Sequence, residues 1–278
     1  MAKVIRENDL DNLTPAFAEN CDVKLTDKCN EGCFFCYEGC TSDGQHSDIL
    51  NQKWIHTLHP YTELAINGND MDHPQLIPFL QILKEQKVIA NITVNQNQFM
   101  NNLDKIDSLY KDDLIFGLGV SLITPTKEFI HEIKKYPNAV IHTINGILNR
   151  GHIAKLSNNN LKILILGYKE LQRGIEYKDK HRPSIYLNQE YLKDNLKNII
   201  DKFDVISFDN LALEQLDVKN SGILTEDAWN EFYMGDDGTV TYFIDAVKKE
   251  FAKNSLSQDR YPTTDSVDDM FRFIQENK

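Results

Sequence analysis

The sequence predicts an α/β fold, an incomplete (β/α)6 parallel barrel followed by a small α+β C-terminal extension. Two observations lead to this prediction. Between residues 23 and 166, short β-rich segments alternate six times with segments of helical periodicity, which is typical of a parallel sheet covered by helices. In addition, residues 161–166 form an apolar run, as expected of a strand that is buried on both faces.

The repeating part of the chain contains six expected strands and five expected helices. The strands are expected at residues 23–25, 62–66, 89–94, 114–122, 139–144 and 161–166. The helices are expected at residues 48–58, 74–87, 100–109, 126–135 and 147–156. The helix over 74–87 is the clearest of them, because its apolar residues recur every three or four positions along one face.

The final third of the chain departs from this repeat. A helix over 189–203 and a strand over 204–208 complete the barrel, which is expected to occupy residues 1–208. The extension, residues 209–278, is expected to contain a hairpin between 232–234 and 240–244, because the intervening Gly-Asp-Asp-Gly segment supplies the positive φ of a tight turn. A last helix over 266–275 follows, with Ser266 as its N-cap.

The composition is that of a globular protein. Of the 278 residues, 41% are hydrophobic and 26% are charged, and the formal net charge is −12. An acidic surface repels phosphate backbones, so that a large nucleic-acid substrate is disfavoured. The sequence starts without an apolar signal core, and no apolar run approaches the length of a membrane span. A reducing cytoplasmic location is therefore expected.

Three of the five cysteines lie within eight residues, in the segment Cys29-Asn30-Glu31-Gly32-Cys33-Phe34-Phe35-Cys36. Thiolates at this spacing can close around one soft metal centre. Gly32 suits such a loop, because a residue without a Cβ allows a tight turn between two ligands. A cubane iron–sulfur cluster takes four ligands, so three cysteines would leave one iron open to a substrate or cofactor.

Zinc offers an alternative interpretation of the same residues. A structural zinc ion needs four ligands, and Cys33 and Cys36 could be completed by Cys21 and Cys40. Neither of these flanking cysteines forms a second CxxC pair, which disfavours the zinc site. A zinc-stabilised binding protein without redox chemistry remains as the rival hypothesis.

The CxxxCxxC motif with the aromatic Phe35 before its last cysteine resembles that of the radical S-adenosylmethionine (SAM) enzymes. The resemblance implies that Cys29, Cys33 and Cys36 hold a [4Fe–4S] cluster whose open iron binds SAM. It further implies that an electron from the cluster splits SAM, giving a 5′-deoxyadenosyl radical that abstracts hydrogen from a substrate. The motif follows the first expected strand, at the end of the barrel where active sites lie.

The same resemblance suggests which residues contact SAM. The segment Asn67-Gly68-Asn69-Asp70 resembles the Gly-Gly-Glu-Pro segment of the family, with Asn69 in the place of the glutamate. Because Asn lacks the charge of Glu, its hydrogen bond to the SAM amino group is expected to be weaker. The residues that the resemblance places around SAM are Phe35, Gly68, Asn69, Asn95, Ser121 and Leu166.

The sequence names no catalytic residue, and it leaves the substrate open. A peptide or a small metabolite is favoured by the acidic charge, a low-potential electron donor is implied as a partner, and a radical SAM enzyme acting on RNA is an alternative. An enzyme that binds cluster and SAM without catalysis is a further alternative, given Asn69. No cysteine follows Cys40, which excludes a Cys-held auxiliary cluster in the extension. Lys169 and Arg173 are expected to be solvated loop charges, with binding of an anionic substrate group or of the SAM carboxylate as the alternative. His142 is expected to be a hydrogen-bonded core residue, with a proton donor as the alternative.

Overall fold

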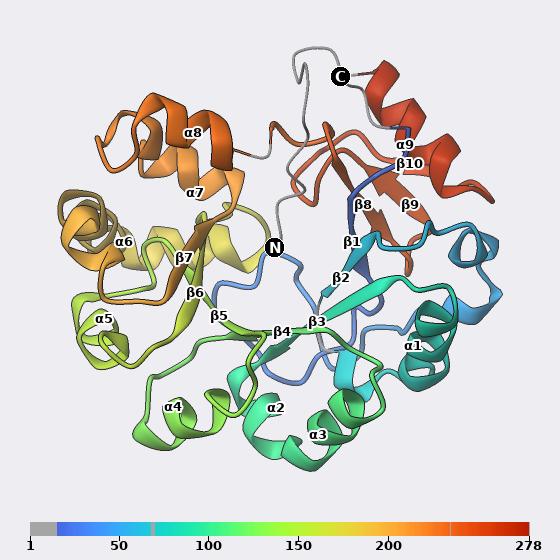
Figure 1. Ribbon diagram of the computed structural model, residues 1–278, viewed down its shortest axis with the longest axis horizontal. Coiled ribbons are helices and arrows are strands. Elements are labelled where there is room, and N and C mark those ends of the chain that lie inside the picture. The colour runs from blue at the N-terminus through green and yellow to red at the C-terminus, as the bar shows by residue number, and fades with distance from the viewer. Residues whose placement is uncertain (1–15, 68–69, 234, 278) are drawn as a thin grey trace.

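A computed structural model of the chain describes residues 16–67, 70–233 and 235–277. Within these residues one sheet contains ten strands, in the order β10-β9-β8-β1-β2-β3-β4-β5-β6-β7. Strands β1 to β7 are parallel and follow one another in both space and sequence, and they curve into an open arc (Figure 1). The expected parallel α/β arrangement is therefore confirmed.

The strands of the arc are short, and helices alternate with them. The strand bounds are β1 Asn20–Lys24, β2 Glu63–Asn67, β3 Ile89–Asn95, β4 Gly117–Ser121, β5 Ala139–Ile144, β6 Lys162–Leu166 and β7 Val205–Phe208. The helices between them are α1 Leu76–Glu85, α2 Gln96–Asn101, α3 Leu103–Lys111, α4 Lys127–Ile133, α5 Arg150–Leu156 and α6 Arg173–Ile200. Three 3-10 turns, η2 Ile49–Asn51, η3 Lys53–His56 and η4 Asp70–Asp72, lie on either side of β2.

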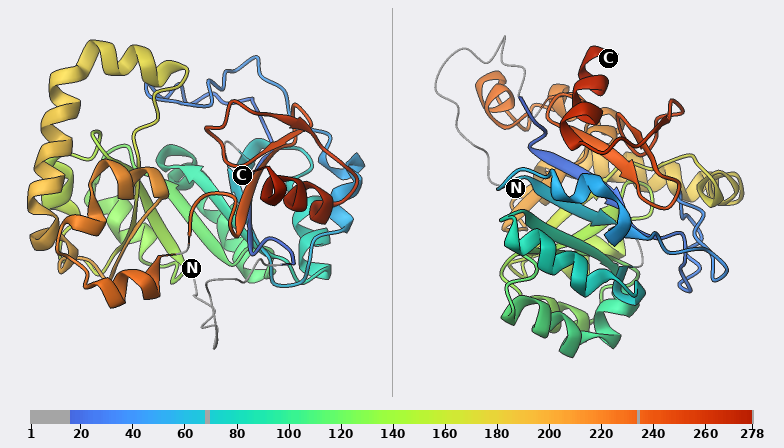
Figure 2. Two further views of the ribbon diagram at one scale, coloured as in Figure 1. Left: turned by 90° about the horizontal axis from the view of Figure 1, so that it is seen from above. Right: turned by 90° about the vertical axis from the view of Figure 1, so that its right-hand side faces the viewer.

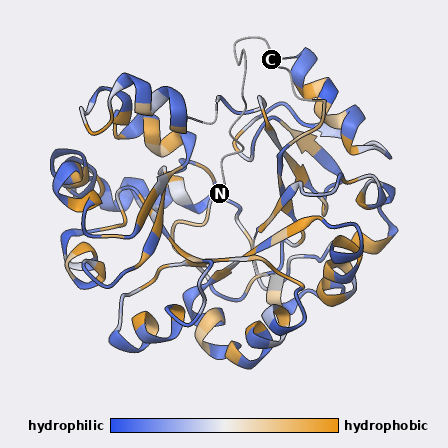
Figure 3. Cartoon of the chain, in the orientation of Figure 1, coloured by the Kyte–Doolittle hydropathy of each residue, from blue (hydrophilic) through white to orange (hydrophobic). Residues whose placement is uncertain are grey.

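The core lies between the outer face of the sheet and the helices. Along β3, the alternate residues Ala90, Ile92 and Val94 are buried in one cluster with helix residues such as Phe79 and Phe99. Because successive side chains of a strand point to opposite faces, the intervening residues face the inside of the arc. Apolar residues accordingly follow the strands and the helix faces that are turned toward them (Figure 3).

The C-terminal segment returns to the first strand. After α7 (Asn210–Gln215), η5 (Val218–Asn220) and α8 (Glu226–Phe232), strand β8 (Thr241–Asp245) pairs in parallel with β1. Antiparallel β9 (Glu250–Ala252) and β10 (Tyr261–Pro262) complete the sheet, and α9 (Val267–Glu276) packs against β8. The views from above and from the right-hand side show this segment beside the amino-terminal strands (Figure 2).

The predicted hairpin between residues 232–234 and 240–244 is wrong. Residues up to Phe232 belong to α8, which Thr225 caps by accepting a hydrogen bond from the Ala228 amide. The partner of β8 is the distant strand β1, and the hairpin of this region lies between β8 and β9. Met234 lies outside the described residues.

Three predicted helices also differ in extent. Residues 49–56 form two 3-10 turns instead of one helix, and the helix predicted over 100–109 is divided into α2 and α3 at Asn102. The helix predicted over 189–203 is the second half of the 28-residue α6. This helix is kinked at His181, two residues before Pro183, because proline lacks the N–H of a helical hydrogen bond and crowds the preceding turn.

None of the helices in the described ranges combines the length and the apolar character that crossing a bilayer requires.

Substitutions at a buried and an exposed leucine of α6 test how this helix packs. Leu192 is fully buried against the core, whereas Leu187 on the same helix is 67% exposed. We expect Leu192→Ala to lower the free energy of unfolding by about 2–5 kcal/mol, because it removes buried methyl groups and leaves a cavity. Leu187→Ala should change it by less than about 0.5 kcal/mol. Urea denaturation of both variants measures the difference, and equal losses would contradict this placement of α6.

Candidate cofactor site at the carboxyl ends of the strands

The segment of residues 26–46, here called the cysteine loop, follows β1 and closes on itself. The Asp27 amide donates to the Gln45 carbonyl (2.9 Å), and the Cys29 amide donates to the Thr41 carbonyl (2.8 Å). At Gly44 the backbone approaches so closely that a Cβ would lie 2.0 Å from the Asp27 oxygen. The loop is thus held in shape by its own backbone, at the carboxyl end of β1.

The three cysteines of the motif lie on a tight turn of this loop. Gly32 has a φ of +61°, in the left-handed region that favours glycine, as the sequence predicted. The Cys36 amide donates to the Cys33 carbonyl (3.2 Å), which brings the last two cysteines together. All three are free thiols and partly exposed.

The three thiols lie within electrostatic reach of one another. Burial raises the pKa of Cys29, and the charge of Cys36 raises it further. Burial also raises the pKa of Cys33, and the charges of both other cysteines add to the effect. Bringing three such groups together is unfavourable when they ionise, unless a positive centre binds them as thiolates.

Cys36 differs from the other two thiols. A hydrogen bond with the Cys40 side chain lowers the pKa of Cys36 to about 5, and a hydrogen bond with the Arg173 side chain acts in the same direction against burial. The pKa of Cys40 is raised by its contact with Cys36, so that Cys40 remains a protonated donor. Cys36 is therefore the cysteine whose negative charge the protein itself stabilises.

Two side chains connect the cysteine loop to β3 and α2. Asn95, the last residue of β3, donates through Nδ2 to the Cys33 sulfur at 3.5 Å and caps α2 through Oδ1. Asn97 donates to the Glu31 carboxylate at 2.9 Å. Because β1 and β3 are parallel members of one sheet, these contacts hold the thiols at the carboxyl end of the arc.

A buried lysine connects the loop to β1 and β8. Lys24 is 3% exposed, and its ammonium group lies 2.5 Å from Asp27, 2.9 Å from Glu38 and 3.6 Å from Asp245. Burial alone would lower the pKa of Lys24, but these carboxylates outweigh it and raise the pKa. The lysine therefore stays charged between the loop and the C-terminal segment.

Helix α6 covers the remaining side of the loop, and the two lie side by side in the views of Figure 2. Arg173, its first residue, donates through Nη2 to the Cys40 carbonyl at 3.0 Å. The ring of Tyr177 stacks on Phe34, with centroids 6.3 Å apart, and meets the edge of Phe35 at 6.2 Å. Phe35 is thus in contact with α6.

The prediction that Lys169 and Arg173 are solvated loop charges is wrong. Lys169 donates to the Ser255 hydroxyl at 3.0 Å and lies 3.9 Å from the ring centre of Tyr37. Both side chains contact other parts of the protein, because the short segment after β6 leads into α6, and the start of α6 lies on the cysteine loop.

The other residues that the sequence placed around SAM are distributed along the strand ends. Ser121 closes β4 in register with Asn95, and Leu166 closes β6 in register with Ile144. Both are partly exposed. Gly68 and Asn69 lie outside the described residues. Asn95 contacts the cysteine loop through Cys33 and Ser121 lies next to Asn95 on β4, and the roles of these residues toward SAM remain predictions.

Two titratable side chains face the inside of the arc. His142 on β5 lies over β4, since a Cβ on Gly119 would be 2.4 Å from its ring, and burial lowers the pKa of His142 to about 4. Asp22 on β1 is partly buried, and burial raises its pKa from 3.8 to about 6 although Lys169 opposes the rise. The sequence analysis did not identify Asp22 and Lys24. The only feature that could have indicated them is that two charged residues stand two positions apart in an otherwise buried strand.

In the C-terminal segment, the carboxylates of Asp209 and Asp237 accept hydrogen bonds from nearby groups. Asp209 caps α7 through the Ala212 amide (2.7 Å) and also accepts from the Gly167 amide (2.8 Å). Asn210 donates to Asp237 at 2.7 Å. These partners belong to capping and turn contacts.

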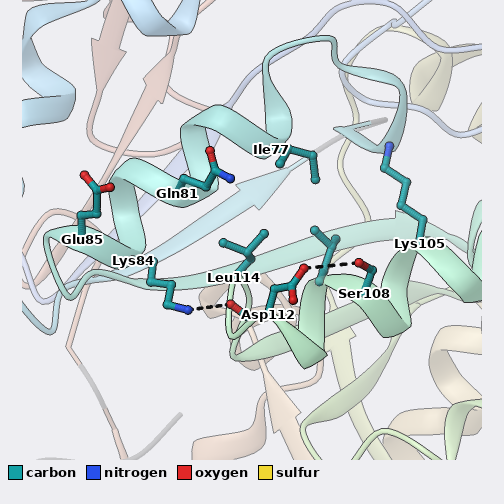
Figure 4. A pocket seen from close by; sticks show the side chains of 9 residues that line it. Ile77, Gln81, Lys84, Glu85, Lys105, Ser108, Asp112 and Leu114 are labelled. Carbon is teal, nitrogen blue, oxygen red and sulfur yellow. Dashed lines mark hydrogen bonds between the residues drawn. The ribbon is translucent and has the colours of Figure 1, made fainter.

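A groove of about 820 Å³ lies away from these residues, between α1 and α3 (Figure 4). Its rim carries polar contacts, such as that from the Lys84 ammonium to the Asp112 carbonyl at 2.8 Å. The lining residues belong to the outer helices and to the segment that precedes β4. Active sites of such sheets lie instead at the carboxyl ends of the strands.

The residues of the cysteine loop fit a [4Fe–4S] cluster. No group of three or more His, Cys, Asp or Glu side chains in the described part of the chain is arranged to hold a single ion. A cubane differs, because each thiolate binds its own iron and three neighbouring cysteines suffice for three corners. The buried Nε of Arg173 has no acceptor within the described residues, and a cluster sulfur is an acceptor of the required kind.

No protein-family model matches the chain, and neither does any curated protein. Solved structures of SuiB from Streptococcus suis share the fold. The SuiB structure with bound S-adenosylmethionine has a TM-score of 0.59 at 14% identity and covers 89% of this chain and 63% of SuiB. The structure with the precursor peptide SuiA has a TM-score of 0.57 at 15% identity and covers 92% and 65%. The chain thus spans just under two thirds of SuiB.

The raised pKa of the partly buried Asp22 carboxyl predicts a pH dependence of stability. Because its pKa is raised on folding, the folded state binds more protons than the unfolded state between about pH 4 and 6, and stability falls as the pH rises through that range. We expect Asp22→Asn to remove this slope and to be more stable than the wild type at pH 7, by on the order of 2–3 kcal/mol. The two proteins should be equally stable below pH 4.

Urea denaturation from pH 3.5 to 7.5 measures this difference. Asp179→Asn serves as the control, because the Asp179 side chain is 66% exposed on α6 and should leave the profile unchanged. An Asp22→Asn profile parallel to that of the wild type would show that Asp22 ionises normally.

Proposed function

We propose that this chain is a radical SAM enzyme that acts on a peptide, with a [4Fe–4S] cluster held by Cys29, Cys33 and Cys36. The observation that carries the proposal is the set of three neighbouring thiols on a closed loop at the carboxyl ends of the strands, anchored to β3 through Asn95. The fold shared with SuiB, which has been crystallised with S-adenosylmethionine, supports it.

The bound cluster would supply one electron to split SAM into methionine and a 5′-deoxyadenosyl radical that removes a hydrogen atom from the substrate. The residues of the chain would hold and orient these groups. The three cysteines would leave one corner of a cubane without a protein ligand, and Asn95 donates to the Cys33 sulfur from the side of β3. Phe35 contacts the ring of Tyr177, which joins the loop to α6.

We assign the SAM site to the strand ends next to the cysteine loop. Asn95 and Ser121, in register on β3 and β4, offer polar groups for the ribose and the carboxylate. Leu166 at the end of β6 offers an apolar contact for adenine. Gly68 and Asn69 follow β2, where the SAM amino group would bind. An uncharged Asn69 makes that contact weaker than one with a carboxylate.

A peptide substrate is supported by the structure of SuiB with its precursor peptide SuiA. The net charge of −12 disfavours RNA. The inside of the arc, with Asp22 and neutral His142, is the place we assign to the reacting part of the substrate. We assign catalysis to residues 1–208 and the covering of the open side to residues 209–278, in a reducing cytoplasm with a low-potential electron donor.

The proposal predicts how the chain behaves after anaerobic reconstitution with iron and sulfide. We expect the wild type to be brown, to contain about four irons per chain, and to release 5′-deoxyadenosine from SAM under strong reductant. Cys33→Ala should lose the cluster and this release. Cys21→Ala is the matched control, because Cys21 is a buried thiol of β1 outside the motif and should keep both.

Other outcomes would contradict the proposal in distinct ways. A colourless protein with one zinc ion would identify a zinc-stabilised binding protein. A brown protein that binds SAM without releasing 5′-deoxyadenosine would lack the catalysis proposed. If a small metabolite or an RNA, and no peptide, stimulates the release of 5′-deoxyadenosine, the substrate belongs to that class of molecule and not to the peptides.

A further inference from the structure

The side chain of Arg173 reaches from α6 onto the cysteine loop. Its Nη2 donates to the Cys40 carbonyl at 3.0 Å, and the guanidinium also lies within hydrogen-bonding reach of the Cys36 sulfur. Its positive charge acts on Cys29 as well. Two of the three cysteines of the motif therefore experience this one cation.

The remaining hydrogen-bonding capacity of Arg173 is unused. Its Nε is buried without an acceptor, and within the described ranges no carboxylate forms an ion pair with the guanidinium. A buried N–H without an acceptor is destabilising. A cysteine thiolate or a cluster sulfide next to Cys36 would satisfy it.

The backbone on both sides of Arg173 is fixed. At Gly174 a Cβ would lie 2.4 Å from the Lys169 carbonyl, and the Gly174 carbonyl accepts a hydrogen bond from the Tyr168 hydroxyl at 2.8 Å. On the other side, Gln172 packs on Gly39 of the cysteine loop, where a Cβ would be 3.3 Å from its side chain. The guanidinium is consequently aimed at Cys36 by the packing of α6 against the loop.

We propose that Arg173 is a positioning residue that donates a hydrogen bond to the sulfur at Cys36 and raises the reduction potential of the cluster. This inference rests on the proposed function. When the cluster accepts one electron from its low-potential donor, its net charge becomes more negative by one unit. A fixed cation and a hydrogen bond to sulfur stabilise that reduced state more than the oxidised state.

Another role for Arg173 is a contact with the carboxylate of SAM. Its Nη2 already donates to the Cys40 carbonyl, and its side chain forms a hydrogen bond with Cys36, so the guanidinium is directed at the loop itself. The two roles differ in what a substitution changes. A cluster donor alters the potential in the absence of SAM, whereas a carboxylate contact alters the affinity for SAM.

The experiment is a redox titration of the reconstituted full chain, monitored by electron paramagnetic resonance without SAM, together with iron and sulfide analysis. We expect the midpoint potential of Arg173→Met to shift to more negative values than in the wild type. Arg173→Lys keeps the charge but loses Nε, and should shift less in the same direction. Arg182→Met removes an exposed cation from the same helix and should leave the potential unchanged.

The other outcomes overturn the inference separately from the proposed function. A fully loaded Arg173→Met with the wild-type potential overturns the role of Arg173 and leaves the enzyme proposal standing, even if SAM binds more weakly. A wild type without iron and sulfide overturns both. If Arg173→Met fails to take up iron, the potential of Arg173→Lys is the deciding measurement. A wild-type potential in that variant would show that the Nε donor does not raise the potential of the cluster.

Discussion

The cysteine loop depends on one buried ammonium group. Lys24 lies at the end of β1, and its three carboxylate partners come from the start of the loop (Asp27), the far side of the loop (Glu38) and β8 (Asp245). Breaking such a buried cluster leaves charges without partners, which is strongly unfavourable. The contact therefore couples the shape of the loop to the return of the C-terminal segment, two parts of the chain more than 200 residues apart.

The other two supports of the loop have different chemistry. On the side of β3 they are neutral amides, Asn95 to the Cys33 sulfur and Asn97 to Glu31. On the side of α6 the support is the guanidinium of Arg173 with the ring of Tyr177. The kink at His181 divides α6, so that its first half contacts the loop while its second half packs against the core.

The parts of the fold that could be predicted are those set by local sequence. The strand over 139–144 has the predicted bounds, because apolar β-branched residues and flanking polar segments define it without distant partners. The first half of α6 was missed, since Gly174 and Pro183 are helix-breaking signals that tertiary packing overrides. The partner of β8 was missed because the pairing with β1 has no local signal.

In the candidate site too, the sequence predicted only the features that local sequence determines. The cysteine spacing identified the loop, and the position after the first strand gave its end of the sheet. Lys24 and Asp22 were not predictable, because a charged residue in a buried strand acquires its meaning only from partners elsewhere in the chain. Gln172 with its positive φ shows the same dependence, since the turn before α6 is shaped by the approach of Gly39.

The three thiols are not equivalent, and this difference constrains what the loop can bind. The pKa of Cys36 is lowered by donors that the chain itself provides, whereas burial raises the pKa of Cys29 and Cys33. A ligand set built for one zinc ion would gather its donors around one point, which the described residues do not do. A cluster spreads its charge over several sulfurs, so local donors can act on one corner while another corner stays open. The unequal surroundings of the cysteines are thus better suited to a cluster than to a single ion.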